Sequence, residues 1–147
     1  MTADATPTIA SFDDLSVRRF HDILRLRTDV FVVEQECIYP ELDGHDPVSR
    51  HAWIDLGDDI ATYIRLIPGD GVTIIGRVVT HPGHRGKGLA GRLLGWILDN
   101  EDGPWELEAQ SYLREWYEAF GFHVTGPEIM LDGIPHIPME RGRAGSS

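Results

Sequence analysis

The spacing of apolar residues predicts a helix near the start of the chain. Apolar side chains recur at intervals of three and four residues after Ser16, a suitable N-cap, so we expect a helix from Ser16 to Arg27 or Phe31. Arg27 lies on the apolar face of this helix and therefore needs an acidic partner. The segment 34–50 that follows is acidic and contains proline and glycine, and a loop of this length is more often functional than a short one. The acids it offers to Arg27 are Glu34, Glu36, Glu41, Asp43 and Asp46.

Alternation of polar and apolar residues predicts several strands in the rest of the chain. Two alternating runs flank a turn at 57–59, a pattern typical of an antiparallel hairpin. Helical spacing returns after Lys87 and again before Gly121, where glycine is a suitable helix end. This order of elements predicts an α/β fold with a mixed sheet. The expected strands are 51–56, 60–67, 73–80, 105–109, 124 with 129–131, and 137–139, and the later helices are 87–98 and 113–120.

Length and charge narrow the class of protein. The 147 residues suit a single domain spanning 1–147, and we expect residues 1–10 and 141–147 to be loose tails. The 24 acids outnumber the 13 lysines and arginines, giving a net charge of −11. This charge argues against nucleic acid and anionic membranes as partners and favours cationic ones.

The chain has no sequence signal for export or for a membrane span. Cys37 is the single cysteine and has no partner for an intrachain disulfide. The stretch 1–10 lacks the basic and apolar regions of a secretory signal, and no apolar run approaches the roughly 20 residues that span a bilayer. A cytoplasmic location is therefore expected.

A glycine-rich segment, HPGHRGKGLAGR at 81–92, joins a predicted strand to a predicted helix. Unpaired amides and the helix dipole favour an anion at such a helix N-terminus, and glycines let the backbone approach a ligand closely. Arg85 and Lys87 add positive charge to an otherwise acidic chain. The alternative is an ordinary turn, but the glycines together with two cations favour a phosphate ligand.

Part of this segment also matches the dinucleotide-binding pattern G-x-G-x-x-G. GKGLAG at 86–91 fits the pattern, and Glu108 follows about 20 residues later. However, residues 82–84 separate the strand from the first glycine, and 105–109 alternates polar and apolar residues instead of being apolar throughout. A Walker A loop would need Ser or Thr directly after Lys87. A dinucleotide is therefore the less favoured ligand.

The same residues resemble the GNAT superfamily of acyl-CoA-dependent N-acyltransferases. RGKGLA at 85–90 fits the family's [Q/R]-x-x-G-x-[G/A] loop, the preceding GRVVTHP resembles its fourth strand, and YEAFGF at 117–122 resembles its Y-x-x-x-G-F block. The resemblance implies a GNAT fold, with a mixed, mostly antiparallel central sheet, splayed strands 4 and 5, and flanking helices. Further matches to the ElaA-like subgroup cover nearly the whole chain, at 26–35, 39–44, 109–110, 132–137 and Met139.

The resemblance implies acetyl-CoA as the acyl donor. In the family the fourth strand pairs with the pantetheine arm at the positions of Val78 and Thr80, and an amide near Val79 or Thr80 faces the thioester oxygen. The residues implied in binding acetyl-CoA are Val78, Val79, Thr80, Arg85, Gly86, Lys87, Gly88, Leu89, Ala90, Gly91 and Gln110.

The implied reaction is N-acetyl transfer by direct attack of an amine through a tetrahedral intermediate. Such a reaction needs a proton donor for the leaving thiolate and a base for the amine. Tyr117 matches the family's proton donor, although its spacing with Trp116 and Phe120 also suits a core aromatic.

The predicted base is Glu34 or His136, with Glu108 as a third choice. The alternative interpretations are a salt bridge from Glu34 to Arg27, a surface or capped imidazole at His136, and a solvated strand position at Glu108.

The acidic segment 34–46 predicts a cationic amine as acceptor, and the sequence leaves open whether this is a small molecule or a protein. The oligomeric state is equally open, a homodimer included. The histidines have no metal-ligand spacing, so we expect no metal site. A non-catalytic acyl-CoA-binding or sensing module is the alternative function.

Overall fold

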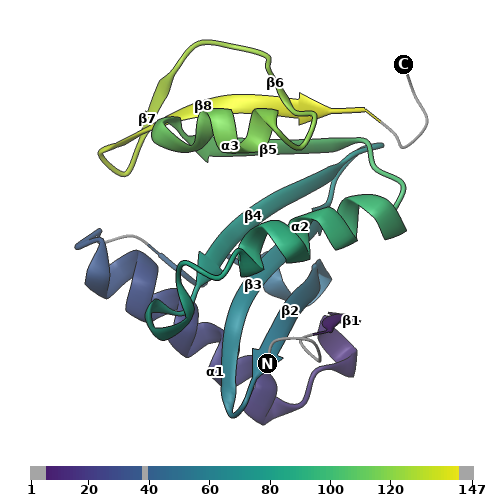
Figure 1. Cartoon of the computed structure of the whole chain (residues 1–147), viewed down its shortest axis with the longest axis vertical. Coiled ribbons are helices and arrows are strands. Elements are labelled where there is room, and N and C mark those ends of the chain that lie inside the picture. The colour runs from purple at the N-terminus through teal and green to yellow at the C-terminus, as the bar shows by residue number, and fades with distance from the viewer. Residues whose placement is uncertain (1–5, 38–39, 143–147) are drawn as a thin grey trace.

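The computed structural model describes residues 6–37 and 40–142, which form one mixed sheet with helices packed against it (Figure 1). The strand order is β1-β2-β3-β4-β5-β8-β6, and β7 pairs with β8. Neighbouring strands are antiparallel except for β4 and β5, which confirms the predicted mixed sheet. The strands are β1 (Pro7–Ser11), β2 (Arg50–Leu56), β3 (Asp59–Pro68), β4 (Thr73–Thr80), β5 (Trp105–Gln110), β6 (His123–Val124), β7 (Ile129–Leu131) and β8 (Ile134–Arg141), and the helices are α1 (Val17–Arg27), α2 (Leu89–Asn100) and α3 (Arg114–Glu118).

The beginning of the described chain is an edge strand. β1 pairs antiparallel with β2, and Ile9 packs against a core cluster. The prediction of a loose tail was therefore wrong for residues 7–10, because the partner that orders them is distant in the sequence. Residue 141 likewise belongs to β8, whereas residues 1–5 and 143–147 lie outside the described residues.

The predicted cap of the first helix is confirmed. The Ser16 hydroxyl oxygen accepts a hydrogen bond from the backbone N–H of Arg19 at 3.0 Å, which satisfies one of the free amides of the first turn. Regular α-helix ends at Arg27, and a π-helical segment over Thr28–Glu34 carries the helical backbone past Phe31.

Two apolar clusters lie on the sheet. Leu93, Leu94 and Ile97 of α2 belong to one cluster, together with residues from β2, β3, β4 and β5. Ile23 and Leu26 of α1 belong to the other, which includes different side chains of β2, β3 and β4. Because side chains alternate between the faces of a strand, the two helices cover opposite faces.

The sheet opens between its two parallel strands. β4 and β5 pair only where Thr73 faces Trp105 and Ile74 faces Glu106. Figure 1 shows the two strands diverging beyond this point. β5 pairs along its whole length with β8 instead. The predicted splay of strands 4 and 5 is thus confirmed, and among the described residues no strand pairs with β4 over 75–80 on the side that β5 leaves.

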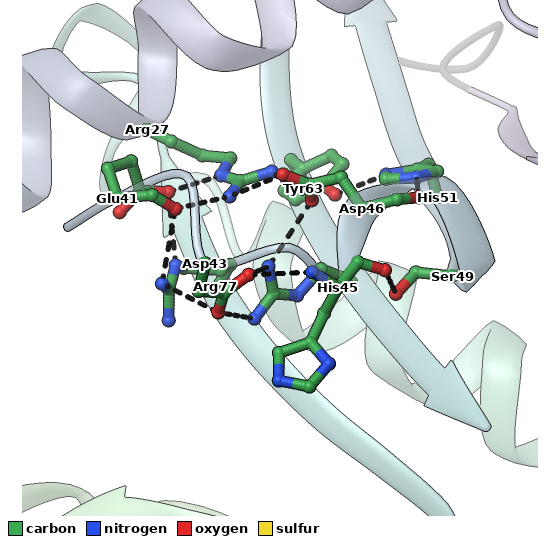
Figure 2. Close-up of polar contacts among 10 residues, drawn as sticks. Arg27, Glu41, Asp43, His45, Asp46, Ser49, His51, Tyr63 and Arg77 are labelled. Carbon is green, nitrogen blue, oxygen red and sulfur yellow. Dashed lines mark hydrogen bonds and ion pairs between the residues drawn. The ribbon is translucent and has the colours of Figure 1, made fainter. Parts of the chain in front are cut away.

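The acidic loop, which lies within segment 34–50, is held against α1 and the sheet by ion pairs. α1, β3 and β4 each supply one arginine, and the loop supplies three carboxylates, so the formal charges balance. The six side chains range from fully buried to 23% exposed. We call this set the arginine–carboxylate network, and its members are Arg27, Glu41, Asp43, Asp46, Arg65 and Arg77 (Figure 2).

Arg27 connects two parts of the loop to α1. Its Nε donates to Glu41 Oε2 at 2.5 Å, and its Nη1 donates to Asp46 Oδ1 at 2.8 Å. The Arg27 side chain is fully buried. The expectation that the acidic segment provides the partners of Arg27 is confirmed, and these hydrogen bonds compensate a charge that water cannot reach.

Arg65 and Arg77 hold the same loop against the sheet. Arg65 donates to Asp43 Oδ2 at 2.7 Å and to Asp46 Oδ1 at 3.2 Å. Arg77 donates to Glu41 Oε2 at 3.0 Å and to Asp43 Oδ2 at 3.2 Å. Burial alone would raise the pKa of Asp43, but the hydrogen bonds from Arg65 and a backbone amide help to lower it to about 2. The three carboxylates that this loop contributes to the network are therefore paired within the protein.

A buried histidine secures the end of the loop. His51 Nε2 lies 3.1 Å from the carbonyl oxygen of Asp46, which can only accept, so Nε2 carries the proton. Nδ1 then accepts from the Tyr63 hydroxyl at 2.5 Å. Burial lowers the pKa of His51, which keeps the ring neutral in this arrangement.

Replacing Arg27 with methionine should destabilise the fold by about 3–5 kcal/mol, because Glu41 and Asp46 would lose a buried counter-charge. Urea unfolding followed by circular dichroism measures the change. Arg25→Met is the control: it lies on the same helix, is 76% exposed and should change stability by no more than about 0.5 kcal/mol. Equal stabilities of the two variants would contradict the role assigned to the network.

Candidate functional site

The open edge of β4 presents a backbone amide at Thr80. The N–H of His81 donates to Ala61 of β3 at 2.8 Å, and successive residues of a strand direct their amides to opposite sides. The N–H of Thr80 therefore points away from β3, toward the side that β5 leaves. Val79 directs its amide toward β3, so only Thr80 of the two predicted positions offers a free N–H at this edge.

A β-bulge interrupts β4 just before this amide. Tyr63 pairs with Val79 and Arg65 pairs with Gly76, so one residue of β3 faces two residues of β4. For the rest of β4, the extra residue reverses which backbone N–H and C=O groups point toward β3 and which point away from it. This shift places the amide of Thr80, and not that of Val79, at the open edge.

The glycine segment forms a cradle at the N-terminus of α2. Gly86 and Gly88 have φ angles of +80° and +71°, a region that favours glycine, and a Cβ at either position would meet no atom within 4 Å. Gly88 is the N-cap of α2, and its carbonyl accepts from Arg92 N–H at 3.1 Å. The amides of the first helical turn therefore have no acceptor within the helix, and an anion fits in front of them.

Gly91 has a packing role. A Cβ there would lie 3.4 Å from Phe120 Cζ and 3.7 Å from an atom of the Trp116 ring, so glycine lets α2 approach these rings. Leu89 is buried in the core, at 3% exposure. Leu89 and Gly91 are both predicted to bind acetyl-CoA. In the structure the two positions serve packing, so only their backbone amides are available to a ligand.

Both cations of the cradle are held by neighbouring side chains. Arg85 makes two hydrogen bonds with the Glu34 carboxylate, at 2.6 and 3.0 Å. The Lys87 ammonium donates to His84 Nδ1 at 3.1 Å, so His84 Nε2 carries the proton and donates to Asp59 Oδ2 at 2.9 Å. The sequence did not indicate the contact between Asp59 and His84, because these residues become neighbours only in the fold.

Asp59, His81 and His84 form one close group of metal-ligand types, with an atom of each within 4.8 Å of the others. His81 Nδ1 accepts from the Gly83 amide at 2.9 Å, which leaves the proton of a neutral ring on Nε2. Both nitrogens of His84 are engaged as well, one of them with the Lys87 ammonium. These hydrogen bonds do not suit a metal site, and the absence of a metal stays a prediction.

The predicted proton donor lies in α3. Tyr117 is 5% exposed and packs edge-to-face on Trp116, with ring centroids 4.9 Å apart. It also packs on Phe122. Burial raises the pKa of the Tyr117 phenol well above its usual value, so the hydroxyl keeps its proton at neutral pH. The interpretation of Tyr117 as a core aromatic is therefore confirmed, and its role as proton donor stays a prediction.

The predicted bases have different partners. Glu34 pairs with Arg85 and not with Arg27, which is occupied by the acidic loop. The hydrogen bond from Arg85 lowers the pKa of Glu34 and so weakens it as a base. His136 Nδ1 donates to the Ile134 carbonyl at 2.8 Å, so in the neutral ring Nε2 carries no proton and can accept one.

β5 and β8 bring His136 and Gln110 together at the open end of the sheet. The two residues face each other across the strand pair, so their side chains lie on the same face. Glu108 and Pro138 pair two positions further along the strands, so their side chains lie on the same face as those of Gln110 and His136. The structure thus groups His136 with a predicted ligand of the acyl donor.

Within residues 6–37 and 40–142, none of the helices is long and apolar enough to cross a bilayer.

Comparison with known proteins identifies the family. Residues 24–142 match the model of the acetyltransferase (GNAT) domain. The chain is 41% identical over 140 residues to the UPF0039 protein Rv2851c of Mycobacterium tuberculosis, covering 90% of both chains. It is 36% identical to protein ElaA of Escherichia coli, covering 87% of this chain and 90% of ElaA.

A solved structure agrees with this assignment. An acyl-CoA N-acyltransferase from Pseudomonas aeruginosa superposes with a TM-score of 0.89 at 35% identity, covering 95% of this chain and all of that one. The predicted resemblance to ElaA-like proteins is therefore confirmed. The chain belongs to the GNAT family of acyl-CoA-dependent N-acyltransferases.

Proposed function

We propose that this protein transfers an acetyl group from acetyl-CoA to an amine. The observation that carries the proposal is the unpaired edge of β4, which ends at the glycine cradle in front of α2. A long donor with an amide-bearing arm and a diphosphate matches both features. The arm has groups that pair with a strand edge, and the diphosphate suits the free amides of a helix N-terminus.

The residues available for the donor lie in three places: on β4, at the cradle and at the end of β5. Thr80 offers its backbone carbonyl to the arm, and Val78 offers backbone groups to it by resemblance to the family. Gly86 and Gly88 leave room for the diphosphate, and the amides of 89–91 face it. Arg85 and Lys87 supply positive charge beside the cradle. Gln110 lies across the opening, at the end of β5.

The amide of Thr80 is the proposed donor to the thioester oxygen. In the reaction the amine nitrogen bonds to the acetyl carbon to give a tetrahedral intermediate, and the bond from that carbon to sulfur then breaks. Negative charge develops first on the oxygen and then on the sulfur. Thr80 N–H stabilises the first charge, and the Tyr117 hydroxyl gives its proton to the second. Solvent then returns a proton to Tyr117.

His136 is the proposed base, in preference to Glu34 and Glu108. It has an unprotonated Nε2 and lies beside Gln110 at the open end of the sheet, so it suits removal of the proton that the amine releases. Glu34 is better suited to holding Arg85 in the cradle, because its two hydrogen bonds with that guanidinium reduce its basicity.

The proposed acceptor is an amine of unspecified charge. A cationic acceptor was expected from the acidity of segment 34–46, but Glu41, Asp43 and Asp46 are neutralised by the arginines of the network. The net charge of −11 of the whole protein still favours a cationic acceptor.

Replacing Gly88 with alanine should weaken acetyl-CoA binding by roughly tenfold or more, because a Cβ would enter the diphosphate cradle and strain the backbone. Isothermal titration calorimetry measures the affinity. Gly57→Ala is the control, since Gly57 also has a positive φ, at +61°, with open space around it, but lies in the β2–β3 turn. Loss of affinity in both variants, or in neither, would contradict the assigned cradle.

Replacing Tyr117 with phenylalanine should lower kcat by roughly a hundredfold and leave acetyl-CoA affinity nearly unchanged. Turnover is followed as release of free thiol from acetyl-CoA with a panel of primary amines. Tyr112→Phe removes a hydroxyl from a 77% exposed tyrosine and should have no effect. Unchanged kcat in Tyr117→Phe would remove Tyr117 from the mechanism. Tight binding without turnover of any amine would favour the acyl-CoA-binding module.

A further inference from the structure

Arg77 has an unfavourable backbone conformation in the middle of β4. Its φ angle is +53°, in the left-handed region, although it is neither glycine nor an asparagine or aspartate that tolerates this region. The residue before it is Gly76, whose backbone does not need the left-handed region. The strain thus falls on a residue with a long charged side chain, which indicates that this side chain compensates it.

The side chain of Arg77 is anchored on the acidic loop. Its Nε donates to Glu41 Oε2 at 3.0 Å, and its Nη2 donates to Asp43 Oδ2 at 3.2 Å. Figure 2 shows the guanidinium directed at both carboxylates. Arg27 and Arg65 hold the same two carboxylates from α1 and β3. The anchor is therefore fixed by elements other than β4.

Arg77 belongs to the bulge that determines which amide of β4 faces the open edge. Arg77 and Val78 together face one residue of β3, Ile64. Without the extra residue, β4 beyond this point would shift by one position against β3. Thr80 would then direct its amide to β3, and Val79 would take its place at the open edge.

We propose that Glu41 and Asp43 are positioning residues for acyl transfer. By pairing with Arg77 they offset its left-handed strain and hold the bulge that directs the Thr80 amide to the open edge of β4. Neither carboxylate contacts the reacting atoms in this role. The effect on catalysis rests on the proposed function of Thr80, whereas the effect on the direction of the amide does not.

Backbone hydrogen exchange followed by NMR tests the structural part without any substrate. In the unmodified protein, the Val79 amide should exchange slowly and the Thr80 amide rapidly. Arg77→Ala should reverse this order, changing each rate by roughly tenfold or more, because the bulge loses its anchor. This variant leaves Glu41 paired with Arg27 and Asp43 paired with Arg65, which favours folding.

Arg77→Gly separates backbone strain from charge. Glycine adopts a positive φ without a Cβ clash, so this variant should keep the original exchange order although it also lacks the guanidinium. Asp43→Asn should show a partial reversal. Arg19→Ala removes a different ion pair, with Asp55 of β2, and should leave both rates unchanged.

Two outcomes would overturn the proposal. Unchanged exchange at Val79 and Thr80 in Arg77→Ala would show that the bulge needs no anchor. Reversed exchange in Arg77→Gly would show that relief of strain is not what the carboxylates provide.

The kinetic part uses the same variants. Arg77→Ala should lower kcat by roughly ten- to a hundredfold, with a much smaller change in the KM for the amine, and Arg77→Gly should regain most of kcat. Equal kcat in Arg77→Ala and the unmodified protein would overturn the catalytic part. If the unmodified protein turns over no amine, the proposed function fails, and the exchange experiment still decides the positioning role.

Discussion

The arginine–carboxylate network is the interaction on which the rest of the structure depends. It places three arginines and three carboxylates in largely buried positions, where each charge is tolerated only while its partners remain. The network joins α1, β3 and β4 through one irregular loop. This loop, in which the Leu42 and Val48 side chains are exposed, is thereby held against the sheet.

The functional site follows from this constraint and from the parting of β4 and β5. The network reaches β4 at Arg77, where the strand contains its bulge, and the bulge determines which amides face the opening. β5 turns to β8 as its partner, so the edge of β4 stays open up to the glycine cradle. In the proposed function, the gap in the sheet and the N-terminus of α2 together bind one long ligand.

Sequence patterns predicted the local elements well. Helical spacing located α1 and α2, Ser16 was the correct cap, and the turn at 57–59 joined the expected hairpin. The glycine segment was noted because glycines leave the backbone accessible to a ligand, and the space beside Gly86 and Gly88 is open. These features depend on residues close together in the chain, so their signals are visible in the sequence.

Features that depend on distant partners could not be predicted in this way. β1 has no strong pattern and is ordered by β2. The partners of Glu34 and Arg77 lie far from them in the chain, so the sequence suggested Arg27 for the first and nothing for the second. The acidity of the loop suggested a cationic ligand, because the sequence does not show that the opposing arginines come from α1, β3 and β4.

In the proposed function, the open edge of β4 and the cradle at α2 together bind the acyl donor. A crystal structure of the protein with acetyl-CoA would show whether they do. We predict the pantetheine arm between β4 and β5, hydrogen-bonded to the backbone of Thr80, with the diphosphate on the amides of residues 88–91. Acetyl-CoA bound elsewhere on the protein, with β4 and β5 paired beyond Ile74, would contradict it.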